Sequence, residues 1–267
     1  MRSMFSFLAL SLTLLGSQAP KTDWNELDSQ VEELYQAGEY DVALVLAQRA
    51  LELAKTEFGI EHLNTAQSLD ALGRLYYAKA DYLRAGPPLQ RALAIRKSTL
   101  GLDDPFTAAS LNNVASLYQA RGDYANAERL FQSSLAIREK KLDPNHRDIA
   151  TSLNNLGALY VLEGDYSRPV PLLTRALIIS ERESGVNSPD TAMKVNNLGQ
   201  VYYLKANYQR AQGLYQRAHN IYKDALGADH PYTLITATNL ANTYRAEGDF
   251  ANAEPLYQGV QIGRAHV

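Results

Sequence analysis

The sequence predicts an all-α solenoid built from stacked antiparallel helix pairs, and two regularities lead to this fold. The first is an apolar residue, a small residue directly after it and a tyrosine three positions further on. Copies of it begin 42 residues apart, at Leu72, Val114, Leu156, Leu198 and Leu240. The second is an aromatic residue in the same register, at Tyr40, Tyr82, Tyr124, Tyr166, Tyr208 and Phe250. A fixed period of this length is typical of solenoids.

The first helix of each pair can be justified from the third copy. Leu111, Val114, Ala115 and Tyr118 are spaced i, i+3, i+4 and i+7, which places them on one face of an α-helix. The small side chain of Ala115 lets another helix approach this face closely. The spacing therefore predicts a helix that is buried along one side.

A turn and a second helix follow. Gly122 and Asp123 break the first helix, and apolar residues at Tyr124, Ala127, Leu130 and Phe131 form a second helical stripe. The small residue of the turn recurs as Gly38, Ala80, Gly122, Gly164, Ala206 and Gly248. Each repeat is therefore predicted to be a helix, a tight turn, a second helix and a short loop.

The next first helix begins at a proline in three copies, Asp104-Pro105, Ser188-Pro189 and His230-Pro231. Proline suits the first helical position because its missing N–H would have no partner there. We expect an irregular first copy at about 23–58, four full copies within about 65–226, and a last, shortened copy from about 231. Because a single pair cannot bury both of its apolar faces, the pairs must stack. The predicted array spans 23–258.

These residues resemble the tetratricopeptide family. The family's small and aromatic positions appear as Gly73, Tyr76, Ala80, Tyr82, Ala85 and Ala92. The 42-residue period, with Leu153 to Leu156, Gly227 to Pro231 and Ala253 to Tyr257, is similar to the kinesin-light-chain type and to bacterial proteins with the same repeat. The resemblance implies a right-handed superhelix that binds protein or peptide. Pro169 departs from the pattern, but it lies in the first turn of a predicted helix, where proline is tolerated.

In this family the first helices line the concave wall, and the resemblance places a candidate peptide-binding site there. Asparagines in matching positions hold the backbone of a bound peptide, which implies this role for Asn112, Asn154 and Asn196. An asparagine amide can donate to a C=O and accept from an N–H. We expect the following residues, Asn113, Asn155 and Asn197, to bond neighbouring helices instead. Further candidate contacts along the wall are Arg74, Tyr77, Gln200, Tyr203, Asn242 and Arg245.

Composition and motifs argue against other classes of function. The net charge of −3 and the absence of a basic cluster do not favour a nucleic-acid partner. With no cysteine, thiol catalysis and zinc–thiolate sites are excluded. No nucleotide-binding loop, HExxH, Gly-x-Ser-x-Gly or dinucleotide fingerprint occurs, so we expect no enzyme, no metal and no cofactor. His62, His146 and His230 are expected to cap helices or lie in loops, and His219 to pack.

Both ends of the chain differ from the array. Residues 1–19 have a basic start, a core of about twelve apolar residues and a small-x-small exit, which predicts a secretory signal peptide and export to the periplasm or medium. This core is shorter than a membrane span, which needs roughly 20 residues. Residues 262–267 can be encoded by a common sequencing-adapter read, so we expect a non-native tail and a longer natural chain.

Two functions follow as hypotheses. In the first, the chain is an exported scaffold that holds a polypeptide segment in the groove of the array. In the second, it is the sensor half of a larger bacterial protein whose effector, for example a caspase-like protease, is missing. An enzymatic array is the third and weakest interpretation. The sequence does not indicate an oligomeric state.

Overall fold

The computed structural model describes residues 23–265 of the 267-residue chain, and this part contains twelve α-helices and no strand. The predicted signal peptide, residues 1–19, lies outside the described residues. The helices are α1 Trp24–Gln36, α2 Tyr40–Glu57, α3 Leu63–Ala78, α4 Tyr82–Leu100, α5 Pro105–Ala120, α6 Tyr124–Lys141, α7 Arg147–Leu162, α8 Pro169–Glu183, α9 Pro189–Leu204, α10 Tyr208–Leu226, α11 Pro231–Ala246 and α12 Phe250–Ala265. The predicted all-α fold of six helix pairs is confirmed.

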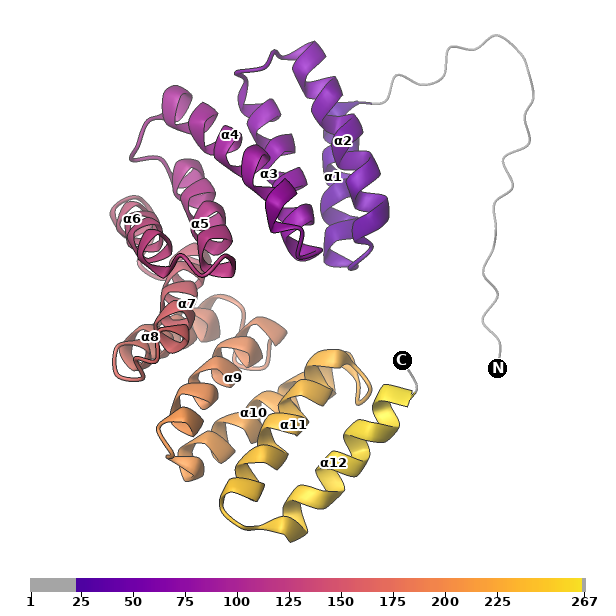
Figure 1. The fold of residues 1–267 in the computed structure, drawn as a ribbon, viewed down its shortest axis with the longest axis vertical. Coiled ribbons are helices and arrows are strands. Elements are labelled where there is room, and N and C mark those ends of the chain that lie inside the picture. Colours follow the sequence, from indigo (N-terminus) through magenta and orange to yellow (C-terminus); the bar gives the residue numbers. More distant parts are fainter. Residues whose placement is uncertain (1–22, 266–267) are drawn as a thin grey trace, which may run out of the picture.

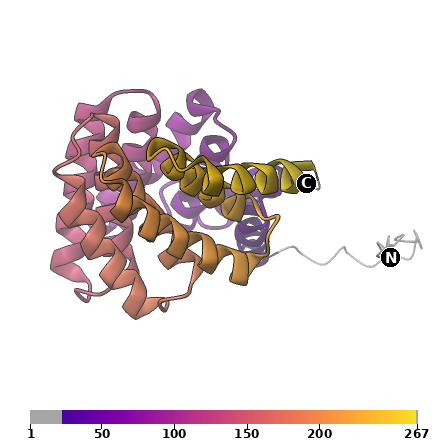
Figure 2. The ribbon, with the colours of Figure 1, turned by 90° about the horizontal axis from the view of Figure 1, so that it is seen from below.

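The pairs follow one another along a curved path, with the first helix of each pair toward the inside of the curve (Figures 1 and 2). Each helix packs against the next one along the chain, and successive first helices also touch, as α1 touches α3 and α5 touches α7. The inner side of a curved stack is shorter, so the first helices lie closer together than the second helices. The first helices α1, α3, α5, α7, α9 and α11 therefore form a continuous inner wall.

The turn inside each pair is the same in all six copies. In α5–α6 the N–H of Gly122 donates to Gln119 O (3.0 Å) and that of Asp123 to Tyr118 O (2.9 Å), which satisfies carbonyls at the end of the first helix. This geometry requires a positive φ at the small residue, +78° at Gly122. Ala80 (φ +57°) and Ala206 (φ +54°) adopt it despite their Cβ atoms.

The predicted helix starts are confirmed, and recurring hydrogen bonds hold the loops that precede them. Asp104 and Ser188 accept hydrogen bonds from N–H groups of the first turn, and so do the Nδ1 atoms of His62, His146 and His230. Four loops are also tied by a threonine hydroxyl that donates to a glycine carbonyl, namely Thr65 to Gly59, Thr107 to Gly101, Thr191 to Gly185 and Thr233 to Gly227. The loop between α6 and α7 has Asp143 and Ile149 at these two positions instead.

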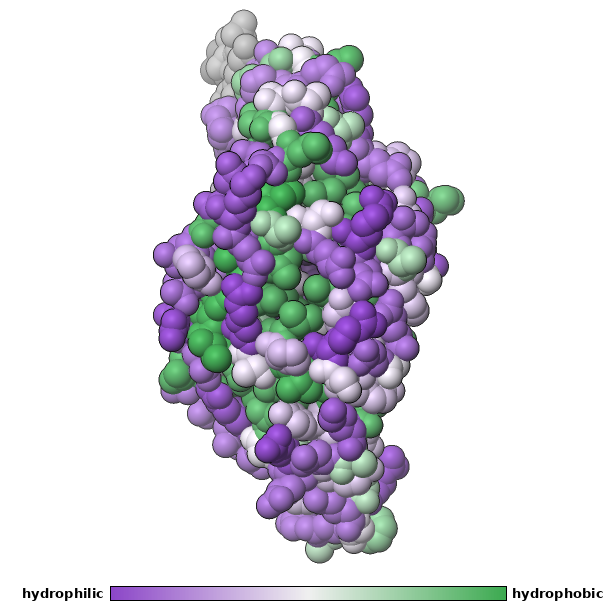
Figure 3. Space-filling model, turned by 90° about the vertical axis from the view of Figure 1, so that its left-hand side faces the viewer, coloured by the Kyte–Doolittle hydropathy of each residue, from purple (hydrophilic) through white to green (hydrophobic). Residues whose placement is uncertain are grey.

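The core continues from pair to pair. One cluster runs from Ala85 of α4 to Tyr160 of α7 and centres on Phe131, which is fully buried. Gly73 shows how closely a pair can pack, because a Cβ there would lie 2.5 Å from Leu89 Cγ of the partner helix. On the face around α6 and α8, apolar residues gather in a strip between hydrophilic margins (Figure 3). Leu135, Ile137 and Leu172 of these helices pack onto the core.

Helix α8 begins at Pro169, three residues later than its counterparts begin after their turns. Proline therefore occupies the first helical turn, as predicted, and the residues before it form an extra loop. The Asp165 carboxylate holds this loop by accepting bonds from Ser167 N (2.8 Å), Arg168 N (3.1 Å) and Arg168 Nε (2.7 Å). The bond from the Arg168 side chain and the two backbone bonds lower the pKa of Asp165 to about 2.

The last pair extends further than the sequence pattern, which ends at Gly259 to Gln261. Helix α12 continues to Ala265, and Val260 is buried against Leu234 and Ala237 of α11. Four residues of the segment 262–267 are therefore helical, and the last two lie outside the described residues. None of the described helices combines the length and the apolar character that a membrane crossing requires.

Candidate peptide-binding site

A ladder of side-chain amides runs along the inner wall and joins each first helix to the next. Asn155 Nδ2 of α7 donates to Asn112 Oδ1 of α5 (3.0 Å), and Asn197 Nδ2 of α9 donates to Asn154 Oδ1 of α7 (2.9 Å). Asn239 of α11 donates to Asn196 in the same way (2.9 Å). The prediction that Asn113, Asn155 and Asn197 bond neighbouring helices is confirmed. Their acceptors are the residues of the predicted peptide clamp.

The first rung explains the direction of the ladder. Asn113 Nδ2 donates to both carboxylate oxygens of Asp70, at 3.0 and 3.1 Å. An ionised carboxylate can only accept, so the amide of the following helix must be the donor. Each later rung repeats this direction with an asparagine in place of the aspartate. The acceptor is always the earlier repeat.

The ladder changes what the predicted clamp residues offer to a ligand. Asn112 and Asn154 are only 7% and 8% exposed, and their Oδ1 atoms accept from the next repeat. Asn196 is half-buried, as are the donor asparagines. Asn112 and Asn154 therefore keep their Nδ2 groups for another acceptor, and Asn155 keeps its Oδ1 atom, whereas Asn196 Nδ2 makes a long bond (3.5 Å) to Asn197 Oδ1 in its own helix. A donor and an acceptor from two adjacent repeats together match a peptide group.

Arg74 and Tyr77 lie together at the N-terminal end of the wall. They line a cavity of about 170 Å³ with Tyr35, Leu89, Asn113 and Ser116. Arg74 Nη1 donates to Glu32 (3.2 Å), and its guanidinium stacks on the Tyr35 ring, 4.4 Å from the centroid. Burial lowers the pKa of Arg74, but Glu32, Tyr35 and Asp70 offset this and raise it overall. Burial raises the pKa of Tyr77, with a smaller contribution from Tyr82.

The same end of the wall carries a surplus of acid. Asp28 of α1 accepts a bond from Gln67 Nε2 of α3 (2.6 Å). Burial raises the pKa of Asp28, the bond from Gln67 lowers it, and the nearby charge of Glu32 raises it further. Together with Asp70, these carboxylates surround Arg74. These carboxylates offset the positive charge of Arg74. This end of the wall would therefore not repel a cationic group of a ligand.

The other four predicted residues lie further along the wall and do not share that cavity. Gln200 is exposed, and Tyr203 is half-buried with its ring 5.5 Å from that of Tyr208. Asn242 Oδ1 accepts a short bond from the Tyr257 hydroxyl (2.6 Å), and Arg245 is exposed. The nine predicted residues thus occupy three places on one wall. These places are the N-terminal cavity, the ladder and the C-terminal end.

Sequence reasoning did not select two contributors to the cavity, Tyr35 and Leu89. Tyr35 lies one 42-residue period before Tyr77, so the repeat register could have identified it. Leu89 could not be found in this way, because it reaches the cavity from the second helix α4 through the space left by Gly73. Among the described residues, no group of three or more histidine, aspartate or glutamate side chains is placed to hold a metal ion.

Comparison with known proteins defines the class. The model of the tetratricopeptide repeat family matches residues 34–98, 106–179, 170–224 and 190–258. The chain therefore belongs to the tetratricopeptide repeat family, a class of helical scaffolds that mediate protein interactions. Among the curated proteins, none matches the chain in sequence.

Solved structures refine this class to the kinesin-light-chain-like type. The chain is 26% identical to nearly identical TPR-like repeats from Podosopora anserina that are assigned to a kinesin light chain (TM-score 0.64, 77% of this chain and 98% of that one). It also resembles BtubC (BKLC) from P. vanneervenii (23% identity, TM-score 0.69, 92% of each chain) and apo RapI (16%, 0.64, 91% and 97%). The last two likenesses concern the fold alone.

Proposed function

We propose that this protein is a non-enzymatic scaffold that holds an extended polypeptide segment against its inner wall. The asparagine ladder carries this proposal. It places side-chain amides one repeat apart along the wall, and the Nδ2 groups of Asn112 and Asn154 and the Oδ1 atom of Asn155 are not used in the ladder, while Asn196 Nδ2 makes only a long bond (3.5 Å) to Asn197. A polypeptide backbone presents the complementary groups whatever its sequence, so such a wall suits a ligand that is recognised mainly through its main chain.

The residues in the middle of the inner wall carry no charge, which supports contact with the backbone of a ligand. The positions in register with Gln67, Asp70, Ala71, Arg74 and Tyr77 hold no charged residue in α5, α7 and α9. They are Ala109, Asn112, Asn113, Ser116 and Gln119, then Thr151, Asn154, Asn155, Ala158 and Val161, then Met193, Asn196, Asn197, Gln200 and Tyr203. Charges occur only toward the ends, at Asp28, Glu32, Asp70 and Arg74 and at Arg245. The uncharged middle of the wall would bind the backbone of the polypeptide ligand, and the charged ends of the wall would select among the ligand's side chains.

The test is isothermal titration of a peptide selected from a library on the wild-type protein. We expect Asn196→Ala to weaken binding about fivefold to tenfold, since one hydrogen bond contributes roughly 1 kcal/mol. Asn220→Ala is the matched control, because Asn220 lies on the second helix α10, away from the inner wall, and accepts a bond from Gln216 in its own helix. Equal affinities of the two variants would refute the role of the wall.

We further propose that the protein acts after export, on the strength of the signal-peptide pattern in residues 1–19. A fusion of residues 1–40 to a periplasm-dependent phosphatase should be active, and the same fusion with Leu10→Arg and Leu12→Arg inactive. The sensor hypothesis makes a separate prediction, that the genomic reading frame continues past Tyr257 into an effector domain. A stop codon directly after this point would eliminate that hypothesis.

A further inference from the structure

In two successive helix pairs, a cation of the second helix bonds the loop that leads into the same pair. Lys140 of α6 bonds Asp103, which lies in the loop between α4 and α5. One period later, Arg182 Nη1 of α8 donates to Asn145 Oδ1 in the loop between α6 and α7 (3.0 Å). These bonds connect the end of the second helix to the loop across the outer side of the array.

The next pair lacks this bond. Asp224 of α10 stands 42 residues after Arg182, and Asn187 of the loop between α8 and α9 stands 42 residues after Asn145. Within the part of the chain that the structure describes, neither the Asp224 carboxylate nor the Asn187 side-chain amide has a hydrogen-bond or ion-pair partner. A carboxylate and an amide are therefore present where a cation connects helix and loop in the two preceding pairs.

A cavity of about 510 Å³ is lined by both of these residues. Gly213, Gln216 and Arg217 of α10 also line it, together with the buried Ile221. Gly213 helps to open the cavity, because no atom lies within 4 Å of a Cβ built there. The five other copies have a larger residue at this position, namely Val45, Pro87, Arg129, Pro171 and Pro255. The volume is within the range of small-molecule sites, about 300–1,000 Å³.

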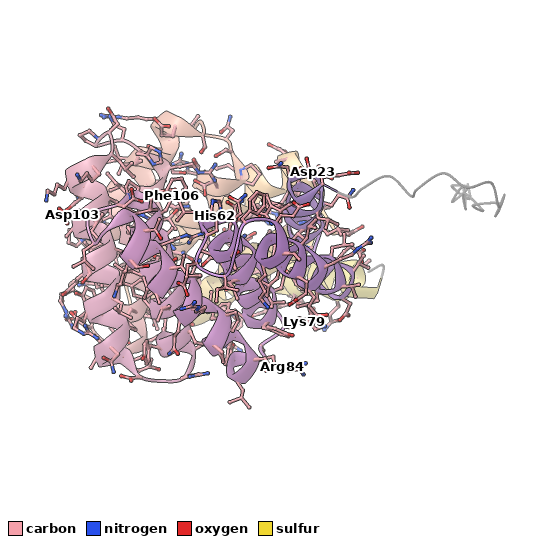
Figure 4. The ribbon with its side chains drawn as sticks, turned by 90° about the horizontal axis from the view of Figure 1, so that it is seen from above. Asp23, His62, Lys79, Arg84, Asp103 and Phe106 are labelled. Atoms are coloured by element: carbon pink, nitrogen blue, oxygen red, sulfur yellow. The ribbon has the colours of Figure 1, made fainter. Side chains whose placement is uncertain are left out.

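The cavity lies at the edge of the array that carries the loops between pairs. In Figure 4 this edge carries Asp103 and His62. Lys79 and Arg84, which lie next to a turn inside a pair, are on the opposite edge. Asn187 occupies the loop position of Asp103 two periods later, and the other lining residues belong to the second helix α10. The cavity is therefore separate from the inner wall, which the first helices form.

The lining residues give the cavity one net negative charge, that of Asp224. Arg217 Nη2 pairs with Glu181 of α8 (2.7 Å), so this ion pair adds no net charge. Lys223 precedes Asp224 in the sequence but lines a different cavity, between α10 and α12. A cationic group of a ligand would therefore meet a carboxylate with which none of the described side chains is paired.

We propose that this cavity binds a small molecule that carries a guanidinium group. The guanidinium would join Asp224 to Asn187, as Arg182 joins α8 to Asn145. A guanidinium suits these partners because it is planar and donates several hydrogen bonds at once, to both oxygens of a carboxylate or to an amide oxygen. Ile221 is the one large apolar residue among the lining residues, so we expect charge and hydrogen bonds to determine the affinity.

The test is a titration of the wild-type protein with butylguanidine at low ionic strength, followed by NMR of the backbone and side-chain amides. Butylurea is the matched probe, since it has nearly the same shape without the positive charge. We expect butylguanidine to bind about threefold to tenfold more tightly, as for a favourable ion pair that is partly open to water. It should also shift the side-chain amide signal of Asn187, which Asn187→Ser identifies by its loss.

Two substitutions of Asp224 test the role of its charge. Asp224→Asn should remove the difference between the two probes, because it keeps the shape of the side chain and removes the charge. Asp224→Arg should abolish the binding of butylguanidine, since the new side chain can bond Asn187 as Arg182 bonds Asn145. Asp224 is exposed, so both variants should fold. Glu247→Gln is the control, because it removes one negative charge at the turn between α11 and α12 and should leave both affinities unchanged.

The outcomes are independent of the proposed function. Equal affinities of the wild-type protein for the two probes, or an unshifted amide signal of Asn187, would overturn the guanidinium site. So would an Asp224→Asn variant that still preferred butylguanidine. Asn196→Ala on the inner wall should leave every one of these values unchanged, so failure of this site and failure of the groove are measured separately.

Discussion

The turns inside the helix pairs and the junctions between the pairs differ in how far they repeat. All six turns make the same two backbone hydrogen bonds and place a small residue at positive φ. At four of the five junctions a buried residue near the end of the second helix contacts the next first helix, but the chemistry differs: Arg96 bonds Ser110, Arg138 bonds Ser152 and Asp148, Ser180 bonds Asp190, and Tyr222 stacks on Tyr232. The turn is defined by the backbone, and the junction by side chains from two repeats.

This difference indicates where the chain can change without losing its fold. The turn tolerates few residue types, because only a few residues can adopt its φ and ψ angles. A junction tolerates many residue types, since any two side chains that fill the space and meet each other's hydrogen-bonding needs can occupy it. The following predictions test this contrast, beginning with the largest expected effect.

Close packing within a pair should be the least tolerant feature. Gly73→Ala should lower the free energy of unfolding by about 1–3 kcal/mol, as overpacking commonly does, because the new Cβ would lie 2.5 Å from Leu89 Cγ. Chemical denaturation measures this change. Gly213→Ala is the control, because no atom lies within 4 Å of a Cβ there, and it should raise stability by up to about 1 kcal/mol. Equal effects of the two substitutions would contradict the packing argument.

The turns should respond to backbone conformation alone. Ala206→Gly should raise the free energy of unfolding by about 0.5–1 kcal/mol, since positive φ costs an L-residue roughly 1–2 kcal/mol and glycine gives part of this back as freedom of the unfolded chain. Gly122→Ala, at the equivalent turn with open space around its Cβ, should have the opposite sign. Changes of the same sign would show that side-chain contacts, and not φ, decide these turns.

The same contrast explains what the sequence could and could not predict. The helices, the turns, the proline starts and the histidine caps depend on residues a few positions apart, and each was predicted. The place of Pro169 in a first turn followed from the same local reasoning. The pairing of Asn155 with Asn112 and the contact of Leu89 with the Arg74 cavity join residues from different helices, so spacing alone did not give them. Val260 was missed because glycines interrupt the pattern around it.

Substitution of His219 should have the smallest effect on stability. It tests how the junction between α10 and α11 responds to pH. The four residues that precede His219 at 42-residue intervals, Leu51, Leu93, Leu135 and Leu177, are all leucine, and Gln261 follows it one period later. Burial lowers the pKa of His219, the contact of Nδ1 with Thr233 O (3.3 Å) partly offsets this, and Lys223 lowers it further. The folded state therefore binds fewer protons than the unfolded state. The contribution of His219 to the free energy of unfolding is fully present above the pKa of the unfolded state, about 6.5, and is lost as the pH falls below that value.

We expect His219→Leu to flatten the fall in stability between neutral pH and pH 5, as measured by denaturation midpoints at each pH. The leucine removes the proton-binding group and restores the residue that four other junctions use, so it should not weaken the junction at pH 7. His146→Asn is a control at a capping histidine, where the N–H of Asp148 is the partner and a side-chain acceptor remains after the substitution. If His219→Leu left the pH profile unchanged, the half-buried imidazole of His219 would not be the source of acid sensitivity at this junction.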